Sequence, residues 1–185
     1  MKRFLSLAGM VCCCVPAWAE EIDLGFNADA LRIAYVHEFQ RNALELDGGW
    51  LHHSDKGDVV HVGLNLSDIA SSGSRELVAG LGGRIVYQDG DRRNQDGWSV
   101  PVGGFLLFTP QQFDRITLGA AAYFAPSVLS VGDAERYQDY TLRLAYNVMR
   151  QADVYAGLRY VKGEYDTAED AYFDTGLHIG LTLRF

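Results

Sequence analysis

The chain has 185 residues, of which 16 are basic and 24 acidic, and its formal net charge is −8 at pH 7. This length suits a single domain, and the acidic excess argues against nucleic acid as a partner. The three cysteines stand together as Cys12, Cys13 and Cys14, so the rest of the chain offers no disulfide and no thiolate site.

The N-terminus has the three parts of a secretory signal peptide. These are a short positive region, an apolar stretch too short to cross a bilayer as a helix, and an A-x-A cleavage site: Lys2 and Arg3, residues 4–15, and Ala17-Trp18-Ala19. We therefore predict a signal peptide over residues 1–19 and cleavage before Glu20. The mature protein would be one domain over residues 20–185.

Two other interpretations of the N-terminus fit less well. An uncleaved membrane anchor is disfavoured because the apolar run is short and ends at Pro16, before small residues. A lipoprotein signal is disfavoured because Met10 and Val11 are not the small residues expected before a lipidated cysteine. Cleavage would remove Lys2 and Arg3 and leave 14 basic and 24 acidic residues, a net charge of −10.

Beyond the signal, no run of about 18 apolar residues predicts a transmembrane helix. Apolar residues instead recur at every second position in segments separated by polar turns, as in strands whose two faces meet different environments. The expected strands lie at residues 31–39, 44–50, 60–66, 77–87, 98–108, 116–124, 140–148, 154–160 and 173–185.

The alternate positions of these strands are rich in glycine and charged residues. A soluble sandwich also alternates, but this second face suits the crowded polar lumen of a narrow membrane barrel. The side chains expected in the lumen are Arg32, Glu38, Glu45, Asp47, Glu76, Arg84, Asp139, Arg143, Asp153, Arg159, Asp174 and Arg184.

Connection lengths help to count the strands. Short and long connections mostly alternate, as periplasmic turns and extracellular loops do in outer-membrane barrels. If the C-terminus is periplasmic, an even barrel needs one more strand before residue 31, and Ile22, Leu24 and Phe26 supply it. We predict an all-β fold, an antiparallel transmembrane β-barrel of ten strands, with eight as the alternative.

Aromatic residues near the expected strand ends favour the two girdles that border a membrane. Those toward the long loops are Trp50, Tyr87, Trp98, Phe124, Tyr140 and Phe173, and those toward the short turns are Phe108, Phe113 and Phe185. Ordinary core aromatics are the alternative, but the clustering at strand ends favours girdles.

The last strand resembles the pattern that the barrel assembly machinery reads. A polar residue is followed by a glycine two positions later and by apolar residues three and five positions after that glycine: His178, Gly180, Leu183 and Phe185. An exposed final strand of this kind can pair with the assembly machine before the barrel closes.

Three segments resemble the YfaZ family of outer-membrane proteins. They are Gly80-Leu81-Gly82-Gly83-Arg84-Ile85-Val86-Tyr87, Ala122-Tyr123-Phe124-Ala125-Pro126-Ser127-Val128-Leu129-Ser130 and Tyr155-Ala156-Gly157-Leu158-Arg159-Tyr160. The terminal strand from Gly180 to Phe185 fits as well. The resemblance covers most of the mature chain, less clearly before Asp58. It implies a small outer-membrane barrel and supplies no catalytic or ligand-binding residues.

The leading functional hypothesis is a barrel of structural or interaction role whose lumen is plugged by paired charges, because an unpaired buried charge is costly. The alternative is a narrow, porin-like channel for small solutes or ions, lined by the same charges and by glycines. The expected partners are outer-membrane lipid, lipopolysaccharide, the export machinery and the barrel assembly machinery. No cofactor is expected, and the oligomeric state is open.

An enzyme is the third hypothesis, with His52, His53 and Asp55 at the rim as the candidates. An Asp–His pair could activate water, and neighbouring imidazoles could hold a metal ion. We favour a solvated loop, because adjacent strand residues point to opposite faces. The acidic run Glu164, Asp166, Glu169 and Asp170 lacks calcium-loop spacing. We therefore assign no catalytic, cofactor or metal residues.

Overall fold

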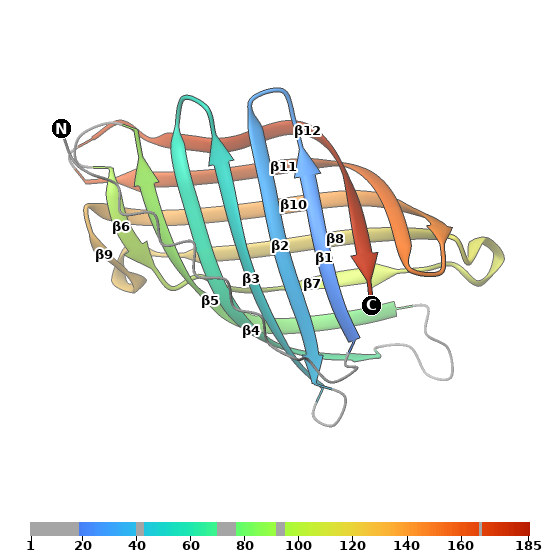
Figure 1. The fold of residues 1–185 in the computed structure, drawn as a ribbon. Helices are drawn as coiled ribbons and strands as arrows, with labels where there is room; N and C mark the ends of the chain where they lie inside the picture. The colour runs from blue at the N-terminus through green and yellow to red at the C-terminus, as the bar shows by residue number, and fades with distance from the viewer. Residues whose placement is uncertain (1–18, 40–42, 70–76, 92–94, 167) are drawn as a thin grey trace.

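A computed structural model describes residues 19–39, 43–69, 77–91, 95–166 and 168–185 of the chain (Figure 1). Its strands are β1 (Ala19–Phe26), β2 (Ala30–Phe39), β3 (Leu44–His53), β4 (Gly57–Ile69), β5 (Leu77–Gly90), β6 (Asp96–Ser99), β7 (Val102–Phe108), β8 (Ile116–Ala125), β9 (Ser130–Gly132), β10 (Ala134–Met149), β11 (Ala152–Tyr165) and β12 (Ala171–Arg184). Two short 3-10 turns, Gln111–Phe113 and Ser127–Leu129, interrupt them. No helix within these described ranges is long and apolar enough to cross a membrane.

The strands close into an antiparallel barrel of ten, as expected, and not eight. Neighbouring strands pair in the order β4-β3-β2-β1-β12-β11-β10-β8-β7-β5, and pairing of β5 with β4 closes the ring. The first strand, β1, is the additional strand before residue 31 that an even number of strands required. It joins β2 to the terminal strand β12. Because every wall strand has two partners, the ring leaves no unpaired edge.

The expected strand at residues 98–108 is split into β6 and β7. Both segments pair with β5, but the ladder breaks at Val100 and Pro101. Proline has no backbone N–H to donate, which explains the break. The Pro101 carbonyl still accepts a hydrogen bond of 2.9 Å from the Arg84 N–H, so the wall stays continuous.

The barrel is flattened. Figure 1 shows the front strands β1 to β5 crossing the strands of the back wall at a steep angle. β12 approaches β3 and β4 directly, although β1 and β2 lie between them in the sheet. Side chains from opposite walls can therefore meet inside the lumen.

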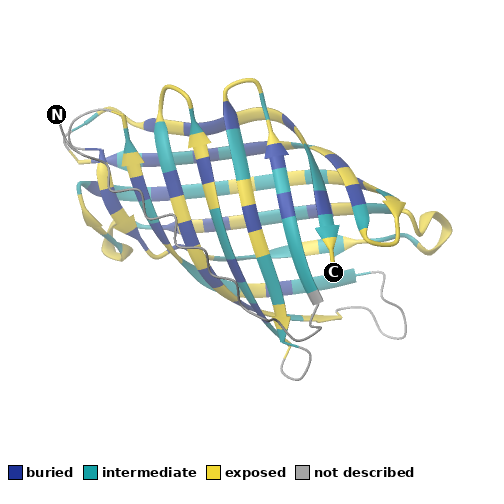
Figure 2. Ribbon diagram, viewed as in Figure 1, coloured by how far each residue is buried: buried dark blue, intermediate teal, exposed yellow. Residues whose placement is uncertain are grey.

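The polarity of the barrel wall is the reverse of that of a soluble protein, because apolar side chains cover the outside and polar side chains lie inside. Exposed and buried residues alternate along the strands (Figure 2). Large apolar side chains face outward, among them Leu81 with 75% of its surface exposed and Leu177 with 77%. Buried residues include many charged and polar side chains. An apolar exterior around a polar interior is the arrangement required of a barrel in lipid.

Both chain ends of the barrel, at Ala19 and Phe185, lie at one end, which we call the terminal end; the opposite end is the loop end. The predicted alternation of short and long connections is wrong. The connection between β3 and β4, at the loop end where long loops were expected, contains only residues 54–56. The connection between β7 and β8, at the terminal end where short turns were expected, contains residues 109–115. The ten-strand count rests instead on the strand pairing itself.

Most of the expected girdle aromatics face outward. At the loop end these are Trp50, Trp98, Phe124 and Tyr140, and at the terminal end they are Phe108, Phe113 and Phe185. Tyr87 is half-buried and packs against Trp98, with ring centroids 4.9 Å apart.

The assignment of Phe173 to a girdle is wrong, because its side chain is fully buried inside the barrel. The ladder between β11 and β12 shifts register here: Val161 pairs with Asp174, whereas Lys162 pairs with Tyr172. Phe173 is therefore the extra residue of a β-bulge, which reverses the inward and outward parity of the strand. A period-2 pattern cannot locate such a shift.

Candidate functional site

The lumen is the candidate site, and it contains three layers. An apolar layer fills the loop end, an ion-paired layer crosses the middle, and a cavity lies toward the terminal end. Inward-facing side chains from every wall contribute to these layers, because strand parity and the barrel's flattening bring them together.

The apolar layer differs from the crowded polar lumen that the sequence predicts. Its residues form one contact cluster that includes Leu51, Val59, Val86, Tyr137, Val161, Tyr165 and Phe173. They come from β3, β4, β5, β10, β11 and β12, which lie on opposite sides of the ring. This apolar cluster lies between opposite walls of the lumen, and the buried side chains of Gln88 and Ser99 lie beside it, with the Tyr165 hydroxyl donating to Gln88 at 3.4 Å. We call the apolar cluster the loop-end plug.

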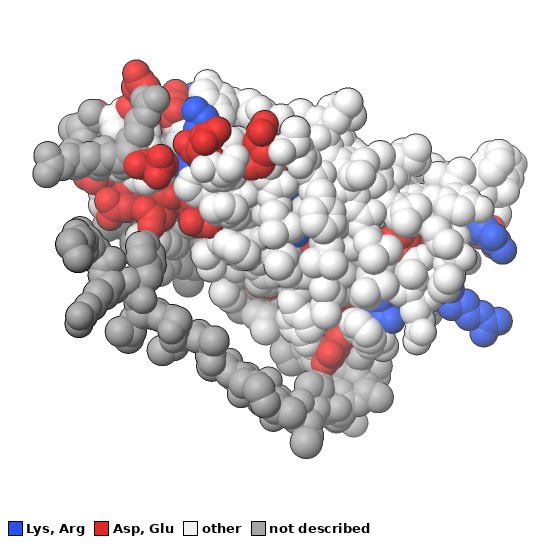
Figure 3. All heavy atoms as spheres, turned by 45° about the horizontal axis from the view of Figure 1, so that its top comes forward, with Lys and Arg blue, Asp and Glu red and all other residues white. Residues whose placement is uncertain are grey.

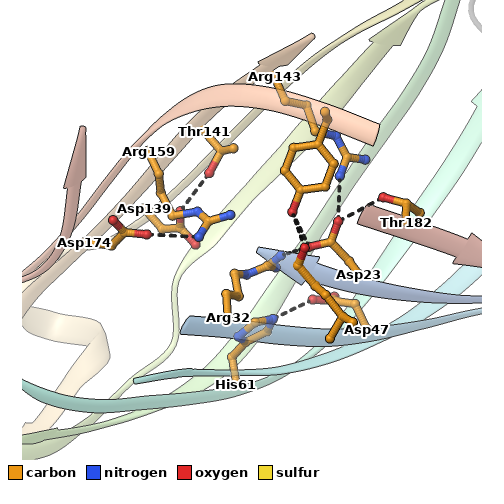
Figure 4. A network of polar contacts seen from close by, with 12 residues as sticks. Asp23, Arg32, Asp47, His61, Asp139, Thr141, Arg143, Arg159, Asp174 and Thr182 are labelled. Atoms are coloured by element: carbon orange, nitrogen blue, oxygen red, sulfur yellow. Dashed lines mark hydrogen bonds and ion pairs between the residues drawn. The ribbon is translucent and has the colours of Figure 1, made fainter. Parts of the chain in front are cut away.

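Asp23 organises one half of the ion-paired layer (Figure 4). Its carboxylate lies 2.9 Å from Arg32 Nη1 and 3.4 Å from Arg143 Nη1. The hydroxyls of Tyr155 and Thr182 donate to the same carboxylate at 3.0 and 3.1 Å. One buried acidic side chain thus joins β1, β2, β10, β11 and β12, which are spread over about half of the ring.

Asp47 organises the other half. Its carboxylate lies 3.0 Å from Arg84 Nε and 3.1 Å from His61 Nε2. Asn65 donates its side-chain N–H to Asp47 at 3.0 Å and accepts the Tyr123 hydroxyl at 2.8 Å. The Arg84 guanidinium also stacks over the Tyr123 ring, 3.6 Å from its centroid.

Glycine makes room for the Asp47–Arg84 pair. A Cβ added to Gly63 would lie 2.3 Å from Asp47 Oδ1 and 2.6 Å from Arg84 Cγ. Any larger residue there would force the pair apart. A similar relation holds in the terminal strand, where the Tyr155 ring lies over Gly180 and reaches Asp23.

The predicted lumen residues largely meet inside the barrel. Arg159 pairs with Asp174 at 2.9 Å with both side chains buried, and Arg84 reaches Asp139 at 3.5 Å. The cavity is lined by many of the others, including Arg32, Glu38, Glu45, Asp47 and Arg143.

Two further lumen predictions, Arg184 and Glu38, lie at the edge of the site. Arg184 is half-exposed at the terminal end, where it pairs with Glu21 at 3.4 Å and with Asp153. Glu38 is exposed at the mouth of the cavity. Glu76 lies outside the described residues.

The sequence interpretation missed Asp23, Tyr123 and Tyr155, which are central to the ion-paired layer. Each stands at the polar parity of an expected strand: Asp23 lies between Ile22 and Leu24. The signal that could have identified them is an acidic or phenolic side chain at the alternate position of a strand, between two apolar residues.

The sequence assigns His178 only to the assembly signal, but in the closed barrel it lines the cavity. Its side chain has 2% of its surface exposed, and neither ring nitrogen has a hydrogen-bond partner among the residues that the structure describes. The imidazole packs edge-on against Tyr155 with centroids 5.7 Å apart. A buried polar group without a partner is rare and calls for an explanation.

The two rim histidines contact different groups. His52 Nδ1 lies 2.9 Å from Asp58, and both side chains are more than two-fifths exposed. His53 Nδ1 accepts the backbone N–H of Asp55 at 3.1 Å, which leaves the Asp55 carboxylate outside this contact. Within the described ranges, no group of three or more His, Cys, Asp or Glu side chains is placed to hold a metal ion.

The loop end is strongly acidic (Figure 3). Asp58, Asp89 and Asp96 lie opposite one another on three adjacent strands. Partial burial, and then the nearby charges of Asp96 and Asp58, raise the pKa of Asp89. Lys162 offsets part of this charge at the rim by pairing with Asp170 at 2.7 Å and Glu164 at 2.9 Å. Hydrogen bonds to these two carboxylates raise the pKa of Lys162.

Comparison with known proteins agrees with this architecture. The family model described as "YfaZ precursor" matches residues 1–185. The chain is also 29% identical, over 181 residues, to the protein named "Outer membrane protein YfaZ" from Escherichia coli (strain K12). That alignment covers 97% of this chain and 96% of the relative.

Proposed function

The chain belongs to the YfaZ family and is an integral outer-membrane β-barrel, and from this premise we propose that its barrel is closed to solutes and has a structural or interaction role. The observation that supports this most is the loop-end plug, in which apolar side chains from opposite walls meet within the lumen. Ions do not cross a continuous apolar layer readily, because each would lose its hydration there.

The ion-paired layer supports the same proposal. Asp23 and Asp47 each bind guanidinium groups from other strands, so the charges in the middle of the lumen are mostly neutralised. Charges that are paired and hydrogen-bonded have less need of water than the hydrated rings that line conducting pores. We propose that the lumen holds the walls together and that recognition takes place on the acidic loop end, facing lipopolysaccharide and the cell exterior.

Single-channel conductance of the refolded mature protein in a planar bilayer tests this proposal. An unboiled gel must first confirm folding. We expect no reproducible current steps from the wild type, because the loop-end plug blocks the lumen. Regular steps with a defined ion selectivity would overturn the proposal and establish the narrow channel instead.

A plug variant locates the barrier. Tyr137→Ala combined with Phe173→Ala removes two large plug side chains and should allow brief openings. Trp98→Ala is the matched control, since Trp98 faces outward with 54% of its surface exposed. Steps from the plug variant alone would place the barrier in the plug. Silence from the folded double variant would assign the barrier to the ion-paired layer.

We further propose that the rim histidines have no catalytic role. His52→Ala and His53→Ala should leave the lipid A of expressing cells unchanged, because the two imidazoles bind different groups and share no metal site. Mass spectrometry of extracted lipid A provides the measurement. A modification that depends on either histidine would reinstate the enzyme hypothesis.

A further inference from the structure

The part of the lumen toward the terminal end contains a cavity of about 160 Å³. For comparison, a cavity of about 150 Å³ in a protein core accommodates benzene. This cavity is lined largely by ionisable side chains, which makes it unsuited to an apolar ligand. Its volume therefore corresponds to a polar molecule of about six non-hydrogen atoms.

The mouth of the cavity carries an excess of negative charge. Glu38 and Glu45 face each other across the β2–β3 ladder, and both line the cavity. Among the described residues, neither carboxylate forms an ion pair, and Glu45 accepts only a long hydrogen bond of 3.4 Å from Asn65. Glu45 is nevertheless 91% buried, since 9% of its surface is exposed. Like charges directly opposite each other destabilise a sheet unless a cation joins them.

The inner end of the cavity carries no such excess and is instead rich in hydrogen-bond donors. The guanidinium groups of Arg32, Arg84, Arg143 and Arg159 pair there with the carboxylates of Asp23, Asp47, Asp139 and Asp174. His178 lines the same cavity with both ring nitrogens buried and unpartnered. A ligand with hydrogen-bonding oxygens would supply what these groups lack.

We propose that this cavity binds a small zwitterion of the amino-acid type. The ligand's ammonium group lies between Glu38 and Glu45, and its carboxylate faces His178 and the nearby guanidinium groups. The unpaired carboxylates at the mouth select an ammonium group, and the imidazole without a hydrogen-bond partner inside, next to the guanidinium donors, selects a carboxylate, so a molecule that carries both groups fits best. The inference rests on the proposed closed lumen, which makes the cavity a dead-end pocket open at the terminal end.

Calorimetric titration of the mature protein, refolded in an uncharged detergent, tests the proposal with three probes of similar size. β-Alanine carries both charges, propylamine lacks the carboxylate, and propionate lacks the ammonium group. We expect β-alanine to bind at least tenfold more tightly than either of the others, because each deleted charge removes a charge-assisted hydrogen bond.

Two variants assign the ends of the ligand. Glu45→Gln should weaken β-alanine and propylamine binding about tenfold or more. The same variant should raise the melting temperature without ligand, because it relieves the repulsion of Glu38; a merely structural role for Glu45 predicts a lower melting temperature. His178→Phe should weaken β-alanine and leave propylamine unchanged. Glu135→Gln, at the loop end of β10, is the matched control and should bind as the wild type does.

The outcomes separate the hypotheses. Equal affinity for propylamine and β-alanine would show that the site binds cations only, and would overturn the proposal. Propionate binding as tight as that of β-alanine would show that the site binds anions only, and would also overturn it. Absence of heat with all three probes, or β-alanine binding unaffected by Glu45→Gln, would also overturn it. Conductance reports separately on closure: a silent barrel that binds nothing refutes this inference alone, whereas a conducting barrel that binds β-alanine refutes only the proposed function.

Discussion

Asp23 shows how one side chain can tie a barrel together. Its surface is 3% exposed, and two guanidinium groups and two hydroxyls from four other strands converge on its carboxylate. A buried carboxylate with this many donors exchanges its lost hydration for charge-assisted hydrogen bonds. The walls of the flattened barrel are thus joined across the lumen as well as along the sheet.

The substitution Asp23→Asn tests this role with little change in volume. It leaves Arg32 and Arg143 without a common carboxylate, and breaking a buried ion pair costs about 3 kcal/mol or more. We expect a corresponding loss in the free energy of unfolding, measured by urea titration in lipid vesicles. Asp29→Asn, at an exposed loop position, should change it by less than about 0.5 kcal/mol. An unaltered urea midpoint for Asp23→Asn would contradict the role.

His178 and Gly180 bear two constraints at once. Both belong to the predicted assembly pattern, and both also shape the closed lumen: Gly180 leaves space for the Tyr155 ring, and His178 lines the cavity. A side chain that is required before the barrel closes need not form hydrogen bonds in the closed barrel. The assembly signal alone would therefore account for an imidazole without hydrogen bonds. The binding experiment with His178→Phe separates this account from a role in the folded barrel.

At the scale of the element, β12 closes the ring by pairing with β1 and β11. The backbone N–H of Phe185 donates to the carbonyl of Glu20 at 2.9 Å, so the last residue pairs with the expected first residue of the mature chain. The Phe185 side chain is 65% exposed. Its removal would therefore cost little packing in the folded protein.

Deletion of Phe185 should lower the amount of protein in the outer membrane and increase its degradation in the periplasm. The expected cause is loss of the aromatic end of the predicted assembly signal, because the residue packs little in the closed barrel. Cell fractionation and immunoblotting measure the effect. Phe113→Ala removes a similarly exposed aromatic at the same end and should insert normally. Normal insertion of the deletion variant would count against the terminal signal.

At the scale of the whole molecule, the two ends of the barrel differ in charge, and the two faces of its wall differ in polarity. Acidic side chains gather at the loop end (Figure 3), and girdle aromatics lie near both ends of the apolar exterior. The loop end would face the outside of the cell if the termini are periplasmic, as they are in bacterial outer-membrane barrels.

Surface labelling of single-cysteine variants tests that orientation, because the mature chain has no cysteine of its own. A membrane-impermeant maleimide should label Asp55→Cys, at the loop end, on intact cells. Gln112→Cys, at the terminal end, should react only after the outer membrane is permeabilised. Both positions are exposed, so accessibility in the folded barrel is matched. The reverse pattern of labelling would invert the proposed topology.

The sequence by itself determined the class of the fold and most of the inward-facing charges, and its prediction of ten strands is confirmed by the strand pairing. It did so because the period of two is a local property: alternation in segments such as residues 60–66 assigns each side chain to lipid or lumen without knowledge of the partners. The family was also recognisable from glycine-rich and aromatic segments, and the whole-chain family match agrees.

Only the tertiary structure decided how the lumen is filled. The bulge at Phe173 shifts the parity of β12 and turns an expected girdle residue into part of the loop-end plug. The shared contacts of Asp23 and the unpaired state of Glu38 and Glu45 depend on which strands approach across the flattened ring. Such features depend on the distances between residues that are far apart in the chain, and a local alternation of residues contains no information about those distances.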